Sequence, residues 1–113
     1  MLSYDDMMVD AGADGRQREA ELLTRSAALM RRADAPGAPP RAAIDAAVFA
    51  ERLWSRLIED LGSPHNALDT PLRADLISIG LFVLRAADAA RRGEGDFRAA
   101  TDVTETLRRG LAS

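Results

Sequence analysis

The chain has 113 residues, of which 47% are hydrophobic and 29% are charged. This length and balance fit one globular domain with a modest core and argue against a disordered chain. The formal net charge of −3 disfavours the nonspecific, counterion-driven binding that basic proteins show toward nucleic acids. The absence of cysteine excludes disulfides, thiolate metal sites and thiol nucleophiles.

The N-terminal segment, residues 1–13, is expected to be a flexible, loosely held lead-in to the domain. It carries acidic residues where a secretory signal would carry basic ones, and no cleavable apolar run follows it. The longest apolar stretch, residues 76–84, is about half as long as a membrane-spanning helix. We therefore expect a cytoplasmic protein that does not insert into membranes.

Two helices are predicted in the first half of the chain, over residues 14–33 and 41–61. In the first helix, Leu23, Ala27 and Met30 are spaced four and three residues apart and so share one face. Residues 34–40, which contain three prolines and a glycine, end it. The second helix carries a longer stripe with the same spacing, formed by Ala47, Ala50, Trp54, Leu57 and Leu61.

A third helix is predicted over residues 71–92, with Thr70 as its N-cap and Pro71 as its first residue. Its middle reads LISIGLFVL, which is typical of a central, buried helix. The β-branched residues in this run also favour a strand, but no turn separates it from the helical residues on either side.

A fourth helix, capped by Asp96, is predicted over residues 96–111. Four helices joined by short loops predict an all-α fold, a small antiparallel bundle of about four helices. Residues 14–113 would form this single domain.

The sequence offers few groups that could carry out catalysis. His65 is the only histidine and lies in a predicted loop, where a solvated side chain is the usual state. Glu59 and Asp60 are neighbours on a helix, so their side chains point about 100° apart. We therefore expect no enzymatic activity, no metal site and no cofactor.

Two features, Gly80 and Trp54, exceed what a plain bundle requires. Gly80 lies within the apolar helix, where glycine costs about 1 kcal/mol relative to alanine. It indicates that another helix approaches closely, either within the bundle or from a partner. Trp54, the only tryptophan, fits either the core or a binding hot spot. Arginine pairs at 31–32, 91–92 and 108–109 lie near predicted helix C-termini, where they complement the helix dipole.

An ordered pattern of residues spans positions 52–85. Its elements are Arg52-Leu53-Trp54, Leu57, Asp60-Leu61, Pro64, Asn66, Leu68, Leu72-Arg73-Ala74, Leu76-Ile77-Ser78-Ile79 and Leu81-Phe82-Val83. This pattern resembles the central signature of the FlaF family of flagellar biosynthesis regulators. The segment from Asp102 to Leu111 is similar to the family's closing pattern, although Thr104 stands where the family has asparagine. Glu51 and Asp69 also depart from the family's frequent residues.

The resemblance implies a cytoplasmic protein that promotes flagellin synthesis and secretion by binding flagellin as an export chaperone. Its partner would be flagellin, whose termini are amphipathic helices that a small bundle could hold by helix-in-groove packing. Two alternatives remain open: the protein could regulate flagellin mRNA directly, or act through an FlbT-type repressor.

The residues predicted to contact a partner are apolar residues that the bundle would fail to cover. Trp54, Leu57, Leu61 and Phe82 are the candidates within the helices. Met7 and Met8 would form a mobile flap, because methionine adapts to varied surfaces. Asn66 is a further candidate, although its position before the third helix favours a role in fixing the loop.

Overall fold

The computed structural model describes residues 13–112, and these form four helices with no strand among them. The helices are α2 (Ala13–Asp34), α3 (Pro40–Leu61), α4 (Thr70–Arg91) and α5 (Arg98–Ala112). The predicted all-α bundle is confirmed, and every predicted helix end lies within two residues of the observed one. The predicted lead-in, apart from Ala13, lies outside the described residues.

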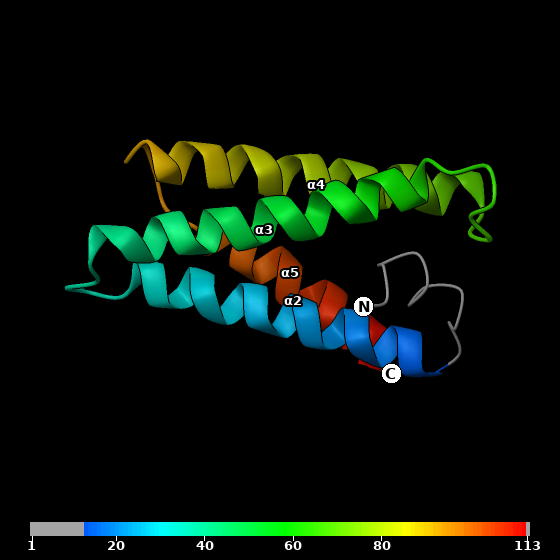
Figure 1. Ribbon diagram of the computed structural model, residues 1–113, viewed down its shortest axis with the longest axis horizontal. Coiled ribbons are helices and arrows are strands. Elements are labelled where there is room, and N and C mark those ends of the chain that lie inside the picture. The colour runs from blue at the N-terminus through cyan, green and yellow to red at the C-terminus, as the bar shows by residue number, and fades with distance from the viewer. Residues whose placement is uncertain (1–12, 113) are drawn as a thin grey trace.

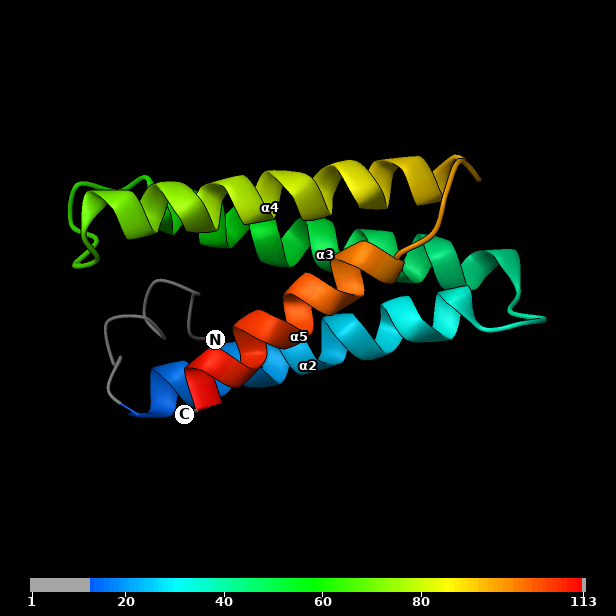
Figure 2. The ribbon, with the colours of Figure 1, turned by 180° about the vertical axis from the view of Figure 1, so that it is seen from behind.

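Consecutive helices run in opposite directions and form two layers. Figure 1 shows α3 and α4 side by side in one layer, with α2 and α5 in the other. α2 packs along both α5 and α3, and α3 packs along α4, whereas α4 and α5 have few contacts. Figure 2 shows the reason: α5 crosses away from α4 and follows α2 toward its N-terminal end. The layers therefore close tightly at one end of the bundle and diverge at the other.

The core consists of the predicted stripes, buried where the two layers meet. Its largest fully buried side chains are Trp54 of α3, Phe97 before α5, Met30 of α2 and Val83 of α4. Alanines fill the spaces between them on every helix: Ala27, Ala46, Ala47, Ala50, Ala87 and Ala100 are almost completely buried. Small residues at these positions allow the helix backbones to approach each other, which fits the alanine-rich composition.

The C-terminal end of α2 is joined to the N-terminal end of α5 by Asp34. Its carboxylate oxygens accept hydrogen bonds from the backbone N–H of Phe97 at 3.0 and 3.1 Å. The carboxylate of Asp96 accepts one from the N–H of Arg98 at 3.0 Å. Free N–H groups at a helix N-terminus attract carboxylates. Asp96 was predicted as the cap; α5 begins two residues later, at Arg98, and a carboxylate distant in sequence shares that task.

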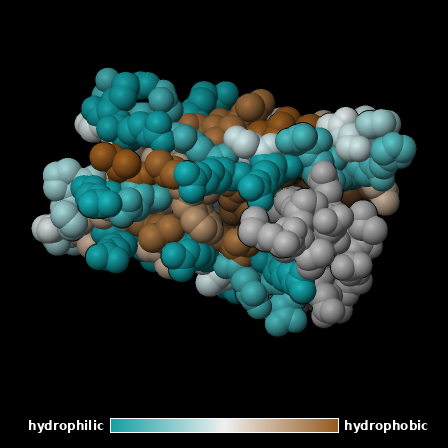
Figure 3. Space-filling model, in the orientation of Figure 1, coloured by the Kyte–Doolittle hydropathy of each residue, from teal (hydrophilic) through white to brown (hydrophobic). Residues whose placement is uncertain are grey.

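α4 is not the central, buried helix that its apolar composition predicts. Leu81 and Phe82, in the middle of the apolar run, are 45% and 39% exposed. The prediction is wrong because α4 lies at the edge of the bundle: it packs along α3 but has little contact with α5. Figure 3 shows hydrophobic residues at the surface along α4, on the upper edge of the molecule.

Candidate functional site

The loop between α3 and α4 is held in place by the side chain of Asn66. Its amide nitrogen donates hydrogen bonds to the backbone oxygen of Asp60 at 3.2 Å and to the Asp60 carboxylate at 3.0 Å. Its amide oxygen accepts one from the backbone N–H of Leu68 at 3.0 Å. One side chain thus joins the end of α3 to the residues before α4, which confirms the predicted loop-fixing role of Asn66.

Arg73 of α4 is directed back into the same loop. Its guanidinium donates hydrogen bonds to the backbone oxygens of Leu61 and Ser63, both at 3.4 Å, and to the hydroxyl of Thr70 at 3.3 Å. The last carbonyls of a helix lack intrahelical partners and carry its negative dipole end, so a guanidinium is well suited to them. The positive charge of Arg73 therefore stabilises the loop.

The N-cap of α4 is Asp69 rather than the predicted Thr70. The Asp69 carboxylate accepts a hydrogen bond from the backbone N–H of Leu72 at 3.1 Å, and Thr70 is already the first helical residue. The prediction is wrong because the carboxylate one position earlier reaches the third helical N–H, as N-cap residues do. Pro71 then occupies the first turn, where its missing N–H is not needed.

Trp54 of α3 lies directly against Gly80 of α4. A Cβ atom at position 80 would lie 2.5 Å from Cε3 of Trp54 and 3.1 Å from Cδ1 of Ile58. Of the two interpretations of Gly80, a contact within the bundle is therefore the one that the structure shows. Trp54 is only 2% exposed, which makes it a core residue of this bundle.

The apolar stripe of α4 is covered at one end of the helix and uncovered at the other. Val83 and Ala87 are completely buried. Toward the N-terminus the same stripe continues through Leu76, which is half-buried, to Leu72, which is 44% exposed. The side chains belong to one helical face, so the loss of burial comes from the divergence of the two layers.

We call the incompletely covered part of this stripe the open face. It comprises Leu72, Leu76, Ile79 and Phe82, at i, i+4, i+7 and i+10 along α4. Leu81 is as exposed as Leu72, but it lies about 160° around the helix from Val83 and faces away from the bundle. α4 thus has two separate exposed apolar surfaces, of which only the open face continues the core.

Two of the residues predicted for partner binding are covered by the bundle. Trp54 and Leu61 are both buried, so the expectation that they are left uncovered is wrong. Trp54 is covered because it packs on Gly80, and Leu61 continues the same buried stripe of α3. Leu57 is partly buried against the core. A role of these residues in partner binding stays a prediction.

The other predicted residues lie at different places. Asn66 is half-buried in the loop between α3 and α4, and Phe82 is exposed on the open face. Met7 and Met8 lie outside the described residues. Sequence analysis missed Leu72 as a surface residue, because its position on the stripe of Val83 is typical of the core.

Arg91 and Arg92, one of the arginine pairs near the helix C-termini, are engaged in ion pairs within the protein. Arg91 forms an ion pair with Glu51 of α3 at 2.7 Å. Arg92 pairs with both Asp88 and Glu94. Carboxylates next to these guanidinium groups offset the positive charge that would attract a phosphate backbone. These contacts favour a structural role for the pair.

Glu105 of α5 connects the two helices of the second layer. It forms ion pairs with Arg31 of α2 at 2.8 Å and with Arg108 at 3.1 Å. The hydrogen bond from Arg31 is the main reason that the pKa of the Glu105 carboxyl lies below its ordinary value, with Arg108 contributing further. The ion pair between Arg31 and Glu105 adds a polar connection beside the buried interface of α2 and α5.

Thr104 is completely buried, and its hydroxyl donates a hydrogen bond to the backbone oxygen of Ala100 at 2.7 Å. The position where the resembling family has asparagine is therefore part of the core in this chain. A side chain there does not reach a surface where it could contact a partner.

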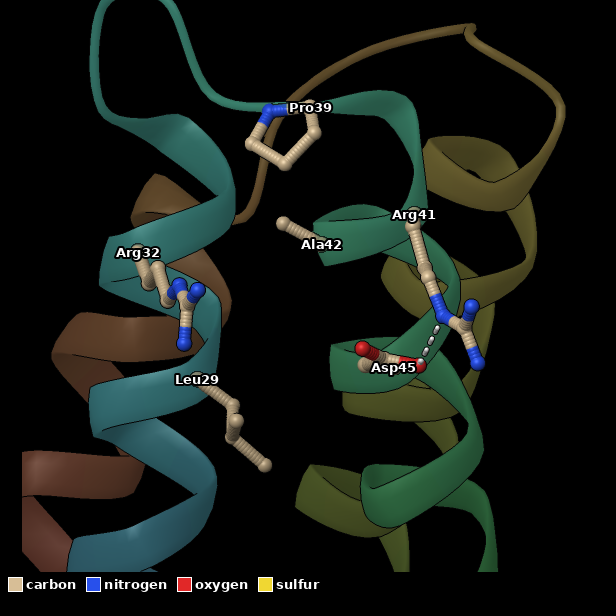
Figure 4. A pocket seen from close by; sticks show the side chains of 6 residues that line it. All are labelled: Leu29, Arg32, Pro39, Arg41, Ala42 and Asp45. Carbon is tan, nitrogen blue, oxygen red and sulfur yellow. Dashed lines mark ion pairs between the residues drawn. The ribbon is translucent and has the colours of Figure 1, made fainter.

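The hollows on the described surface offer little for chemistry. Figure 4 shows one between α2 and α3, lined by Leu29, Arg32, Pro39, Arg41, Ala42 and Asp45. Three of these side chains are charged, and Nε of Arg41 lies 4.0 Å from a carboxylate oxygen of Asp45. Within residues 13–112, no three His, Asp or Glu side chains come together as metal ligands would. None of the described helices is long and apolar enough to cross a membrane.

A comparison with protein families gives one match that covers nearly the whole chain. The family profile described as "Flagellar protein FlaF" matches residues 1–111. No curated protein and no solved structure matches the chain. The matched region includes the four helices, the loop held by Asn66 and the open face.

Proposed function

This chain belongs to the FlaF family of flagellar proteins, and on that basis we propose that it is a cytoplasmic flagellin-binding chaperone that promotes flagellin synthesis and export. The observation that supports binding is the open face of α4. There, large apolar side chains of a core stripe stay partly exposed in the described bundle, with Leu72 at 44% and Phe82 at 39%. Exposed apolar surfaces of this kind are typical of sites that bind other proteins.

Binding of a helix is the mode of recognition that suits such a surface. An amphipathic helix recognises its partner through apolar residues three or four positions apart, which matches the spacing on the open face. The family resemblance implies flagellin as the partner, and its termini are amphipathic helices. By covering these termini the protein would keep flagellin monomeric before export.

The test is calorimetric titration of purified flagellin monomer with the purified chain, without nucleotide or metal. We expect a saturable complex with one chain per flagellin, which also co-elutes in size-exclusion chromatography. Absence of both heat and co-elution, with both proteins folded, would contradict the proposal. Capture of an FlbT-type regulator, or of flagellin mRNA, in place of flagellin would instead support regulation through those partners.

A further inference from the structure

The open face of α4 has a length and a chemistry that define its occupant. From Leu72 to Phe82 it extends about 15 Å along the helix axis, or about three helical turns. Leu72 and Phe82 at its two ends are exposed, while Leu76 and Ile79 between them are half-buried. A single helix of similar length would cover all four side chains. It would lie beside α4 on the side from which α5 turns away toward α2 (Figure 2).

Three carboxylates lie at the outer end of the open face. Asp75 follows Leu72 by one helical turn, Asp69 caps the helix, and Asp60 is held by Asn66 in the adjoining loop. No ion pair involves any of the three within the described part of the chain. The guanidinium of Arg73, four residues after Asp69, is hydrogen-bonded to the loop carbonyls. The rim is therefore acidic.

The acidic rim argues against residues 1–12 as the occupant. They contain Asp5, Asp6 and Asp10 and no arginine, so their charge has the same sign as that of the rim. Like charges in an interface disfavour the wrong partner. A basic segment has the complementary charge. A second copy is distinguished by experiment: a dimer of the free chain in size-exclusion chromatography that Leu72→Ser makes monomeric would identify it as the occupant and overturn a separate partner helix.

We propose that the open face of α4 is the docking site for an amphipathic helix of about three turns. One face of this helix carries leucine-sized apolar residues, and basic residues line the edge that meets Asp60, Asp69 and Asp75. This inference rests on the proposed function and specifies the segment of the partner that is held. The bound helix completes the bundle at the end where the two layers diverge.

The apolar part of the proposal is tested by two matched variants in the full chain, Leu72→Ser and Leu81→Ser. The two leucines are 44% and 45% exposed on the same helix, but only Leu72 belongs to the open face. The probes are flagellin monomer and an amphipathic leucine–lysine peptide of eighteen residues. Leu72→Ser should weaken binding of both about tenfold or more, which corresponds to a loss of about 1.4 kcal/mol, because a few anchor residues carry most of the binding energy of an interface. Leu81→Ser should bind as wild type does, and circular dichroism checks that both variants fold.

The charged part is tested with Asp75→Asn. The control is Asp45→Asn, because Asp45 lies near the N-terminal end of α3, at the opposite end of that helix from the acidic rim. Asp75→Asn should weaken binding of the lysine peptide by up to about fivefold, and added salt should reduce this difference. Asp45→Asn should leave the affinity unchanged. A leucine–glutamate peptide of the same pattern should bind less tightly than the lysine peptide.

Several outcomes would overturn the docking site. One is equal binding of flagellin by wild type and Leu72→Ser, which leaves the proposed function standing. A second is a larger loss of affinity from Leu81→Ser than from Leu72→Ser. A third is tighter binding of flagellin by a Met7→Ser/Met8→Ser variant than by wild type, which would identify residues 1–12 as the occupant. Tighter binding of the glutamate peptide would also overturn it. If wild type binds the lysine peptide with the expected variant effects but does not bind flagellin, the docking site stands and the proposed function fails.

Discussion

The α2–α5 pair and the α3–α4 hairpin differ in how completely the bundle covers their large apolar side chains. Both bury many small residues, and where α2 and α5 pack the large side chains of Leu23, Met30 and Phe97 are buried as well. The hairpin instead packs the indole of Trp54 on Gly80 and leaves Leu72, Leu81 and Phe82 exposed. The core side chains of α2 and α5 are thus covered within the bundle, whereas the hairpin carries more apolar surface than the bundle covers. This difference fits the proposed binding role of α3–α4 and a structural role of α2–α5.

The largest effect should come from removing the side chain on which the hairpin packs. Trp54→Ala should lower the free energy of unfolding by about 3–5 kcal/mol, because it leaves a large cavity in the core. Urea denaturation followed by circular dichroism measures it. A large loss of flagellin affinity with an almost unchanged free energy of unfolding would show that Trp54 is an interface residue and would contradict its place in the core of the hairpin.

Gly80→Ala and Gly110→Ala should change stability in opposite directions. At position 80 the added methyl group overlaps Trp54, which should cost about 1–3 kcal/mol. At Gly110 of α5 no atom beyond the adjoining residues and backbone of the helix itself lies within 4 Å of the added Cβ, so alanine should stabilise the helix by up to about 1 kcal/mol. The melting temperatures of the two variants, compared with that of wild type, test these opposite changes in stability. Stabilisation by both would show that α4 does not approach Trp54 closely.

Asn66→Ala should destabilise the hairpin by about 1–3 kcal/mol, because the Asp60 backbone oxygen and carboxylate and the Leu68 N–H lose their partner. His65→Ala, at the exposed neighbouring position, should change stability by less than about 0.5 kcal/mol. Chemical denaturation of both variants compares them. Equal stability of the two would show that the loop is not held by Asn66.

Glu105→Gln tests the polar connection between α2 and α5. It should cost up to about 1 kcal/mol near neutral pH, because the ion pairs with Arg31 and Arg108 are lost. The pKa of Glu105 is lowered in the folded state, so its stabilising contribution is present above the ordinary pKa of glutamate. It is lost as the pH falls below about 4 and passes the folded pKa.

The measurement is the difference in unfolding free energy between wild type and Glu105→Gln from pH 7 to pH 3. We expect this difference to shrink toward zero at the acidic end. A difference that grows on acidification would contradict the ion-pair interpretation. Glu59→Gln, at an exposed site on α3, serves as the control.

The smallest effect is expected for Ser26→Ala in α2. The Ser26 hydroxyl is buried and has no hydrogen-bond partner among the described residues. Alanine removes the unpaired hydroxyl at little cost in packing, so the variant should be equally stable or more stable by about 1 kcal/mol. Thermal denaturation measures it. Clear destabilisation would indicate that the hydroxyl has a partner in solution.

The sequence predicted the elements and most of the core, because helix stripes and loop signals are local properties. Leu23, Ala27 and Met30 were expected on one buried face, and all three are buried. The loop role of Asn66 was also predictable, since asparagine before a helix often binds nearby backbone. These features depend on residues close in sequence.

The position of each helix in the bundle was not predictable in the same way. Leu72 and Val83 lie on one stripe, and only the course of α5 makes one exposed and the other buried. The hydrogen bonds from Phe97 to Asp34 likewise join residues 63 positions apart. Asp69 could have been found as a cap from its residue type, but Thr70 next to Pro71 gave a competing signal.

Amide hydrogen exchange of the chain, alone and in complex with flagellin, tests the binding role of the hairpin most directly. We predict that flagellin slows exchange in peptides covering residues 68–84, which contain the open face, and changes α2 and α5 little. Protection confined to α2 and α5, with residues 68–84 unchanged in a saturated complex, would contradict the account.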